Sequence, residues 1–232
     1  MRKIIRLDVK RDYVVKGQKF EGYKKIGLVD EISKQLINTP LTEMFYYDLV
    51  ATLFGRNSVL SQLEKLLKEN FIPVTVGGGL DSLKKIEECF ELGVDRVAIN
   101  SATFSDPGLL KHVSRYYGCQ AAISHIEAKK IGGQWCAMFS SGREIGSKNL
   151  VDHIKLVQDL GAGEIILSSV DTDGMMNGFP IEMLELIGPH VFSPTIISGG
   201  LSSFRLAPNL DVFGFIDGIA ISKAILLDET LE

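Results

Sequence analysis

Two carboxylates occupy matching places in a sequence that repeats itself. Asp8 lies in the run LDVK, and Glu127 holds the corresponding place in the run IEAK, 119 residues later. Two carboxylates that face one substrate can move protons to and from it, so both are candidates for general acid–base catalysis. The alternative is that each is a buried carboxylate neutralised by a nearby lysine, such as Lys10, Lys16 or Lys129.

Glycine-rich segments also recur at matching places. The run PVTVGGG at 73–79 returns as PTIISGG at 194–200, and VDRVAINS at 94–101 returns as IDGIAISK at 216–223. Glycines let the backbone approach an anion, and N–H groups that open the next helix point toward it. Tight turns alone would also use such glycines. The duplication favours two phosphate sites, formed by Gly78, Gly79, Asn100 and Ser101 in one half and by Gly199, Gly200 and Ser222 in the other.

A third polar segment, Asp171-Thr172-Asp173-Gly174, follows the apolar run at 165–170. Asp-Gly pairs are common in turns, so ordinary turn chemistry is one explanation. We expect Asp171 or Asp173, with Gly174, to contact the substrate instead.

Short runs rich in Val and Ile alternate along the chain with amphipathic stretches of helical spacing, such as 58–67 and 82–90. This alternation indicates parallel strands joined by helices, and eight such units close most simply as a (β/α)8 barrel. The internal repeat favours two half-barrels, at about 1–118 and 119–232, within one domain. An open doubly wound sheet is the second choice. The expected strands lie near 3–9, 43–48, 72–76, 95–100, 120–127, 164–170, 194–198 and 217–222.

In such a barrel the carboxyl ends of the strands carry the chemistry, and strands one and five face each other. Asp8 and Glu127 are therefore expected on opposite sides of the mouth, between the phosphate sites. Side chains alternate along a strand, so Arg6 points inward if Asp8 does, and His125 points inward if Glu127 does. Buried Arg and His need partners, which are either the two acids or a group of the substrate.

Composition excludes several classes of protein. The 232 residues are 45% apolar and carry a net charge of −4, without the basic excess typical of nucleic-acid binding. Three scattered cysteines without CxxC spacing, and charges where a secretory leader needs an apolar run, predict a cytoplasmic protein with reduced thiols. The four histidines have no metal-ligand spacing, so no metal is expected.

The motifs LDVK and VVKG near the N-terminus, TVGGG, AIN, GAGEI, DTDG and SGG together resemble the cyclase subunit family of imidazole glycerol phosphate synthase. The resemblance covers nearly the whole chain. It implies a (β/α)8 barrel that takes ammonia from a separate glutaminase subunit in a heterodimer. It also implies a bisphosphorylated ribulosyl aminoimidazole-carboxamide substrate, converted to imidazole glycerol phosphate and aminoimidazole carboxamide ribotide in histidine biosynthesis. No cofactor is implied.

The resemblance also assigns roles to residues of this chain. Asp8 matches the first catalytic acid of the family, and Glu127 stands where the second, an Asp, is expected; Lys16 falls within the substrate-site motif VVKG. A ring of charges at the amino-terminal end of the barrel gates ammonia in that family. The positions of that ring correspond here to Arg2, Glu43, Arg96 and Glu164. A further position that contacts the glutaminase in that family corresponds to Asp95.

Several residues depart from the family pattern. Glu127 replaces an Asp, Met175 and Met176 follow the DTDG motif where polar residues are usual, and Leu201 follows the second glycine pair. Arg6 and His125 add polarity to an interior that conducts neutral ammonia. Two alternatives follow: a paralogous subunit that passes ammonia to a sugar of cell-surface glycan biosynthesis, and a non-catalytic partner that keeps only the glutaminase-binding face.

Overall fold

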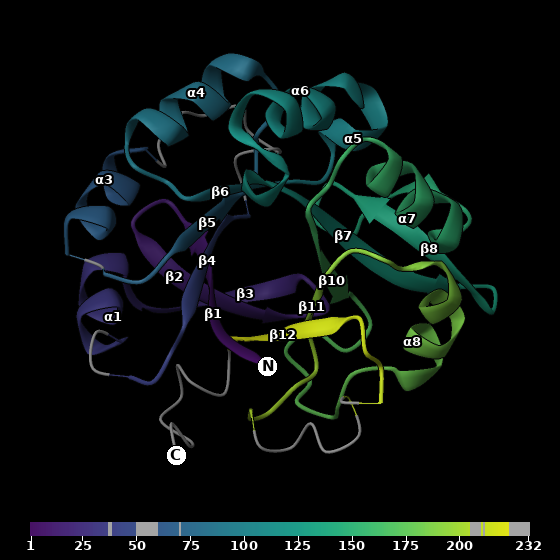
Figure 1. Ribbon diagram of the computed structural model, residues 1–232. Coiled ribbons are helices and arrows are strands. Elements are labelled where there is room, and N and C mark those ends of the chain that lie inside the picture. The colour runs from purple at the N-terminus through teal and green to yellow at the C-terminus, as the bar shows by residue number, and fades with distance from the viewer. Residues whose placement is uncertain (37–38, 50–59, 70, 205–209, 211, 223–232) are drawn as a thin grey trace.

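The computed structural model describes residues 1–36, 39–49, 60–69, 71–204, 210 and 212–222. Its central feature is a closed ring of parallel strands (Figure 1). Strand β12 pairs with β1, and β1 pairs with β4, so the ring has no free edge. In order around the ring, the strands are β1 (Arg2–Lys10), β4 (Glu43–Asp48), β5 (Val74–Gly77), β6 (Arg96–Ile99), β7 (Ala122–Ile131), β10 (Glu164–Ser169), β11 (Thr195–Ser198) and β12 (Ile216–Ile221).

Helices surround the ring on the outside (Figure 1). They form where apolar residues recur at helical spacing, so that one face packs on the strands; in α4, Ile86 and Cys89 are the buried residues. Asn149 begins α7 by accepting a hydrogen bond from the Val151 amide. The helices are α1 (Val29–Leu36), α3 (Leu60–Glu69), α4 (Leu83–Glu91), α5 (Ala102–Ser105), α6 (Gly108–Tyr117), α7 (Leu150–Asp159) and α8 (Ile181–Ile187), with 3-10 turns η1 (Cys119–Ala121) and η2 (Gly188–His190).

Alternation along each strand divides the apolar residues into two layers. In β1, Ile5, Leu7 and Val9 belong to the layer that the helices cover, whereas Ile4 belongs to a separate cluster inside the barrel. The inner cluster is small, and its members are Ile4, Val15, Phe45, Tyr47, Leu49, Ala98, Ile123, Ile166, Ile196 and Ala220. The inward direction of Arg6 with Asp8, and of His125 with Glu127, follows from the same alternation.

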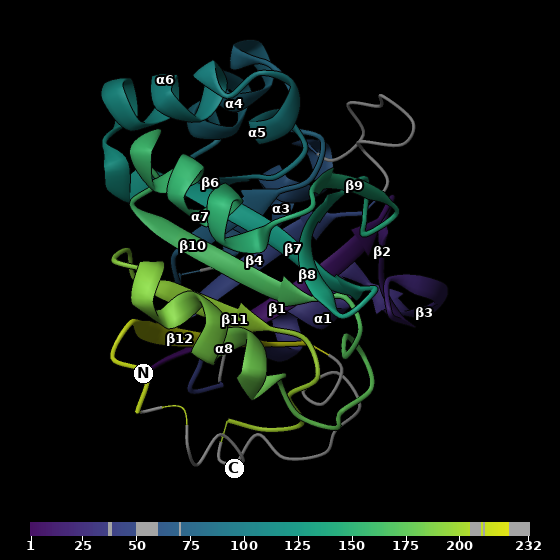
Figure 2. The same cartoon turned by 90° about the vertical axis from the view of Figure 1, so that its right-hand side faces the viewer.

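Two hairpins extend from the carboxyl ends of the barrel strands. Strand β2 (Tyr13–Gln18) turns back on β1 and pairs with β3 (Glu21–Leu28), while β8 (Gln134–Phe139) turns back on β7 and pairs with β9 (Glu144–Ser147). Figure 2 shows β2, β3 and β9 at the end of the barrel opposite the N-terminus. These hairpins occupy the side where a barrel of this kind binds its substrate.

The predicted (β/α)8 barrel is confirmed, and the open sheet is wrong because β12 closes on β1. Each of the eight expected strands is present within a few residues of its predicted bounds. The two hairpins were not predicted from the sequence, because they lie in connections that the barrel pattern treats as loops. Within the described ranges, no helix combines the length and the apolar character needed to cross a lipid bilayer.

At the end of β5, the backbone of Gly78 lies very close to the backbone of Asp48. The φ of Gly78 is +94°, and a Cβ at this position would lie 2.0 Å from the carbonyl oxygen of Asp48. Gly199, its counterpart in the second half, has φ +97° and would place a Cβ 2.7 Å from the carbonyl oxygen of Ser169. The two halves therefore share this turn geometry, which only glycine accommodates.

Gly78→Ala is expected to lower the free energy of unfolding by at least about 3 kcal/mol, because backbone strain and a backbone clash add. Gly93→Ala is the matched control: Gly93 has φ +95°, but no heavy atom lies within 4 Å of the place that a Cβ would take. Strain alone predicts a loss there of about 1–2 kcal/mol. Urea unfolding of both variants measures the difference, and equal losses would contradict the steric argument.

Candidate active site

Asp8 lies at the end of β1 and is almost fully buried between two cations. Its Oδ1 accepts a hydrogen bond from Arg6 Nε at 2.7 Å, and its Oδ2 accepts one from Lys16 Nζ at 2.6 Å. Burial alone raises the pKa of Asp8, but Arg6 and Lys16 outweigh it and bring the pKa below its ordinary value. Asp8 is therefore an anion at neutral pH, and Lys16 is the lysine that pairs with it.

Arg6 fills the barrel interior below Asp8. Its side chain is completely buried, and it extends from β1 toward Ser168 of β10 and Ser198 of β11, whose hydroxyl oxygen lies 3.3 Å from Nη1. The guanidinium carbon lies 5.1 Å from the centre of the Phe20 ring and 5.3 Å from that of Tyr47, a distance typical of cation–π contacts. Among the described residues, none gives Nη2 a hydrogen-bond partner.

Glu127 accepts hydrogen bonds from two different parts of the mouth. Oε1 accepts a hydrogen bond from the Tyr47 hydroxyl, and Oε2 accepts one from the Gly142 amide in the turn between β8 and β9, each at 2.7 Å. Burial raises the pKa of Glu127, although Tyr47, Gly142, Arg6 and Asn100 all oppose the rise. Tyr47 therefore contacts both Glu127 and Arg6, and Arg6 in turn binds Asp8. The two predicted catalytic acids are connected in this way through Tyr47 and Arg6.

His125 lies beneath Glu127 on β7 and is also completely buried. Its Nε2 is 2.9 Å from Ser168 Oγ, and its ring meets those of Phe45 and Tyr47 edge to face, with centres 5.3 and 4.8 Å away. Burial, with a smaller effect of Arg6, holds the pKa of His125 well below its ordinary value. The imidazole is therefore neutral, and its Nδ1 has no hydrogen-bond partner within the part of the chain that the structure describes.

Most residues of the second predicted phosphate site surround a small cavity beside Asp8. Its volume is about 20 Å³, which is room for about one water molecule. The predicted residues that line it are Lys16, Asp173, Gly174, Gly199, Gly200 and Ser222. Asp171 does not line this cavity, because its carboxylate accepts a hydrogen bond from the Lys130 amide at the β7–β8 hairpin. Of the two acids in the DTDG motif, Asp173 is thus the one that reaches the mouth.

The residues of the first predicted phosphate site lie at the ends of β5 and β6. Gly79 has φ +67°, and its carbonyl oxygen accepts a hydrogen bond from Lys85. The Ser101 hydroxyl lies 3.5 Å from the amide of Ser140, and Asn100 lies close enough to lower the pKa of Glu127. This site therefore adjoins Glu127, whereas the second site adjoins Asp8.

Phe20 covers the mouth and was not identified from the sequence. It occupies the tip of the β2–β3 hairpin with φ +60° and is 1% exposed, and its neighbour Lys19 donates a backbone hydrogen bond to Asp173. The same hairpin contributes Lys16 to the lining of the cavity. No sequence pattern distinguishes Phe20 from a surface residue of a turn. Tyr47, in contrast, could have been found, because it alternates with the inward-facing Phe45.

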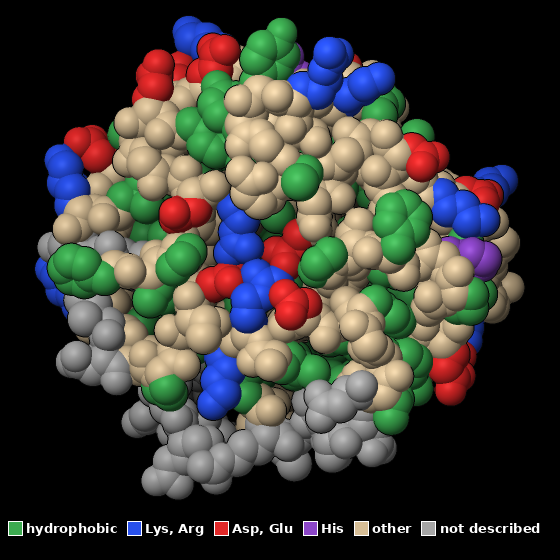
Figure 3. Space-filling view, viewed as in Figure 1, with side chains coloured by type: hydrophobic (Ala, Val, Ile, Leu, Met, Phe, Trp, Pro, Cys, Tyr) green, Lys and Arg blue, Asp and Glu red, His purple; other side chains and the backbone are tan. Residues whose placement is uncertain are grey.

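The charged residues predicted for the other end of the barrel form one network. Arg2 and Arg96 alternate with Glu43 and Glu164, and each arginine pairs with both glutamates. All four open their strands, and Figure 3 shows acidic and basic side chains gathered at the centre of this face. Arg2 also pairs with the exposed Asp217 at 2.8 Å. The ring therefore closes the amino-terminal end of the interior with paired charges.

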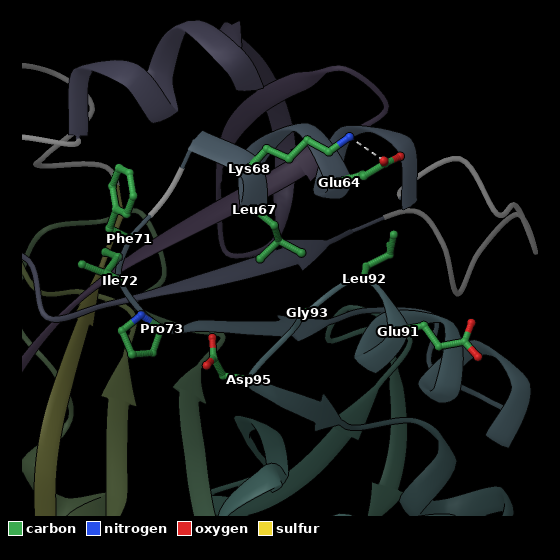
Figure 4. Close-up of a pocket in the computed structure, with 10 residues that line it drawn as sticks. All are labelled: Glu64, Leu67, Lys68, Phe71, Ile72, Pro73, Glu91, Leu92, Gly93 and Asp95. Atoms are coloured by element: carbon green, nitrogen blue, oxygen red, sulfur yellow. Dashed lines mark hydrogen bonds and ion pairs between the residues drawn. The ribbon is translucent and has the colours of Figure 1, made fainter.

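Asp95 borders a separate pocket of about 540 Å³ on the same face (Figure 4). Its carboxylate accepts a hydrogen bond from the Val74 amide at 2.8 Å. Leu67 and Lys68 of α3 line the pocket across from Asp95, and the Phe71 side chain at its rim is 90% exposed. Phe71 was not singled out from the sequence. Across the described ranges, His, Cys, Asp and Glu form no group of three or more that could hold a metal ion.

Comparison with known proteins adds a family relationship to this geometry. The family model described as "Histidine biosynthesis protein" matches residues 4–230. The chain is 38% identical over 207 residues to "Imidazole glycerol phosphate synthase subunit HisF" of Legionella pneumophila, covering 88% of this chain and 97% of that protein. It is 37% identical over 216 residues to the subunit of the same name from Chlorobaculum tepidum, covering 92% and 84%.

The neutral, buried His125 predicts a pH dependence of stability. A histidine whose folded pKa lies below its unfolded value of about 6.5 contributes stability that is complete above pH 6.5 and is lost as the pH falls. His153, whose pKa burial lowers to about 4, acts in the same direction. Each should lower the free energy of unfolding by about 1.4 kcal/mol per pH unit below pH 6.5.

His125→Gln should therefore flatten this dependence by one proton, measured as urea unfolding at several pH values between 6.5 and 4. His153→Gln is the matched variant, and its effect should stop near pH 4, where the folded histidine itself takes a proton. An unchanged slope in His125→Gln would show that the imidazole is not held neutral.

Proposed function

This chain belongs to the histidine biosynthesis protein family, and we propose that its barrel mouth performs the cyclase reaction of imidazole glycerol phosphate synthase. The chain is an enzyme of histidine biosynthesis, since the synthase subunits it resembles align with it over most of their length. In this reaction ammonia attacks the bisphosphorylated ribulosyl aminoimidazole-carboxamide intermediate. Cleavage and ring closure then yield imidazole glycerol phosphate and aminoimidazole carboxamide ribotide.

The observation that carries the proposal is the ionised Asp8 beside the glycine-lined cavity. Asp8 is held by Arg6 and Lys16, and the same Lys16 lines the cavity with Gly199, Gly200 and Ser222. A carboxylate kept as an anion next to a phosphate site can accept a proton from a substrate fixed there. The matching glycine turn at Gly78 and Gly79 supports a second phosphate site at the other side of the mouth.

The subunit works with a partner, and we take that partner to be a glutaminase that docks on the amino-terminal face in a heterodimer. The charged ring of Arg2, Glu43, Arg96 and Glu164 lies at the centre of this face, where ammonia would enter. Exposed apolar side chains also occur in the segments that lead into β5, β7, β11 and β12. These are Phe71, Tyr116, Phe192 and Val212, each at least 74% exposed, and aromatic side chains are enriched at the cores of protein interfaces.

We place this reaction in the cytoplasm. All three cysteines are free thiols, with Cys89 and Cys136 buried and Cys119 exposed. Unpaired cysteines are usual in a reducing compartment.

A second candidate function has one observation in its favour. Arg6 and His125 place a cation and an imidazole inside the barrel, and each has one buried nitrogen without a hydrogen-bond partner among the described residues. Buried donors and acceptors are normally satisfied, so these two are available to a substrate group. A paralogous synthase that passes ammonia to a sugar of a cell-surface glycan would use them in this way.

Asp8→Asn is expected to lower turnover of the intermediate with ammonium at alkaline pH by at least about 100-fold, because the proton-accepting carboxylate is lost. The measurement follows loss of the intermediate and release of the ribotide. Asp12→Asn, an exposed acid in the same β1–β2 turn, is the control and should retain activity. Circular dichroism checks folding, and Asp8→Glu, which keeps the charge, serves if Asp8→Asn unfolds.

The outcomes separate the three functions. Turnover that depends on Asp8 supports the histidine-pathway cyclase. A folded wild-type protein without turnover rejects it and favours the glycan paralogue, which is then assayed with phosphorylated and nucleotide-linked sugars. Equal turnover in wild type and in Asp8→Asn would show that Asp8 takes no part in the reaction. A non-catalytic partner protein would bind the glutaminase and turn over none of these substrates.

Phe71→Ala should weaken binding of the glutaminase subunit by about 10-fold or more, because an exposed aromatic side chain at a pocket rim is a typical interface anchor. Isothermal titration calorimetry measures the affinity. Turnover with glutamine should fall while turnover with free ammonium stays unchanged. Leu156→Ala, an exposed apolar residue of α7, is the control. Unchanged affinity in Phe71→Ala would place the partner elsewhere.

A further inference from the structure

We propose that the Tyr23 hydroxyl donates a hydrogen bond to the substrate at the barrel mouth and that Tyr23 is a further catalytic residue. This inference rests on the proposed cyclase function and adds a neutral donor to its charged residues. Tyr23 lies in β3, the second strand of the hairpin that follows β1. The sequence alone did not single it out, because it lies in a connection between two strands of the barrel.

The ring of Tyr23 is directed from β3 toward the barrel interior. It packs against the inner cluster, to which Val15 and Tyr47 belong. It also lies against Gly17 of β2, since a Cβ at that glycine would be 3.0 Å from Tyr23 Cδ1. Gly17 therefore leaves the space that the ring needs. The hydroxyl at the end of the ring is in this way brought to the mouth.

The Tyr23 hydroxyl is enclosed, and none of the described residues gives it a hydrogen-bond partner. Buried hydroxyl groups normally have one, and a buried hydroxyl without a partner lowers stability. The Tyr47 hydroxyl differs, because it donates to Glu127. The Tyr46 hydroxyl also lacks a partner in the described ranges, but Tyr46 belongs to the layer that the helices cover. Of these three tyrosines, Tyr23 is the one whose unused donor faces the mouth.

Charged residues from both sides of the mouth act on this hydroxyl. Burial and then Asp8 raise the pKa of Tyr23, Arg6 opposes the rise, and Asp173 and Glu127 add smaller increases. Asp8 and Glu127 belong to strands on opposite sides of the ring, so the hydroxyl is close to both of the predicted catalytic acids. Its proton stays on the oxygen at neutral and moderately alkaline pH. Tyr23 therefore acts as a donor and not as a base.

A neutral donor supplies what the anions of the mouth cannot. Asp8 can accept a proton from the substrate, whereas the Tyr23 hydroxyl can stabilise negative charge that develops on a substrate oxygen or nitrogen. A substrate held between the two predicted phosphate sites extends from the Asp8 side to the Glu127 side, and so passes this hydroxyl. The O–H bond of Tyr23 stays intact throughout, and the substrate provides the acceptor that the hydroxyl otherwise lacks.

Tyr23→Phe tests the inference, because it removes the hydroxyl and keeps the ring. In ammonium-dependent turnover of the intermediate, kcat should fall by about 100-fold, with KM changed only a few-fold, since the donor acts mainly on the transition state. The melting temperature should stay equal or rise, because a buried hydroxyl without a partner is removed. Tyr46→Phe, which removes the comparable hydroxyl of the helix-covered layer, is the control and should keep the kcat of wild type.

Two results would overturn the inference. One is a kcat of Tyr23→Phe close to that of wild type. The other is a lower melting temperature in Tyr23→Phe, because the hydroxyl would then support the fold. If wild type itself does not turn the intermediate over, the cyclase function fails, and the melting temperature still decides about Tyr23. A value at or above that of wild type supports a hydroxyl that is held for a ligand, whereas a lower value rejects it.

Discussion

The buried guanidinium of Arg6 is the charge around which the barrel mouth is organised. Burial disfavours a charged group, yet Asp8 and Asp173 outweigh that effect and raise the pKa of Arg6 above its ordinary value. A permanent charge without access to water requires opposite charges and hydrogen bonds nearby. Asp8 supplies both, and the rings of Phe20 and Tyr47 cover the guanidinium.

This requirement connects parts of the molecule that are distant in the sequence. The β2–β3 hairpin contributes Lys16 and Phe20, and its tip donates a backbone hydrogen bond to Asp173. Tyr47 adds the connection to Glu127 and, through it, to the β8–β9 turn. Both hairpins are therefore connected to the paired charges inside the mouth.

The two ends of the barrel use paired charges in different ways. At the amino-terminal end, the two arginines of the ring are partly exposed and the two glutamates are buried, and each residue has at least two partners of opposite charge. The ring therefore borders solvent through its arginines. At the mouth, the pairs are buried and separating them is costly. The apolar side chains of Ile4, Ile123 and Ile166 belong to the cluster inside the barrel, between the two ends.

The sequence by itself determined the barrel, its eight strands and the inward direction of Arg6, Asp8, His125 and Glu127. Strand periodicity is a local property of each strand, and the internal repeat can be read by comparing the two halves of the sequence. It also placed the glycine turns correctly, since a positive φ restricts the residue type. Only the tertiary structure decided which partners each acid has. Tyr47 and Glu127 are 80 residues apart, and Asp171 and Asp173 differ in role although they are neighbours in one turn. Hydrogen-bond partners of this kind depend on how separate elements meet, and no pattern within a single element records them.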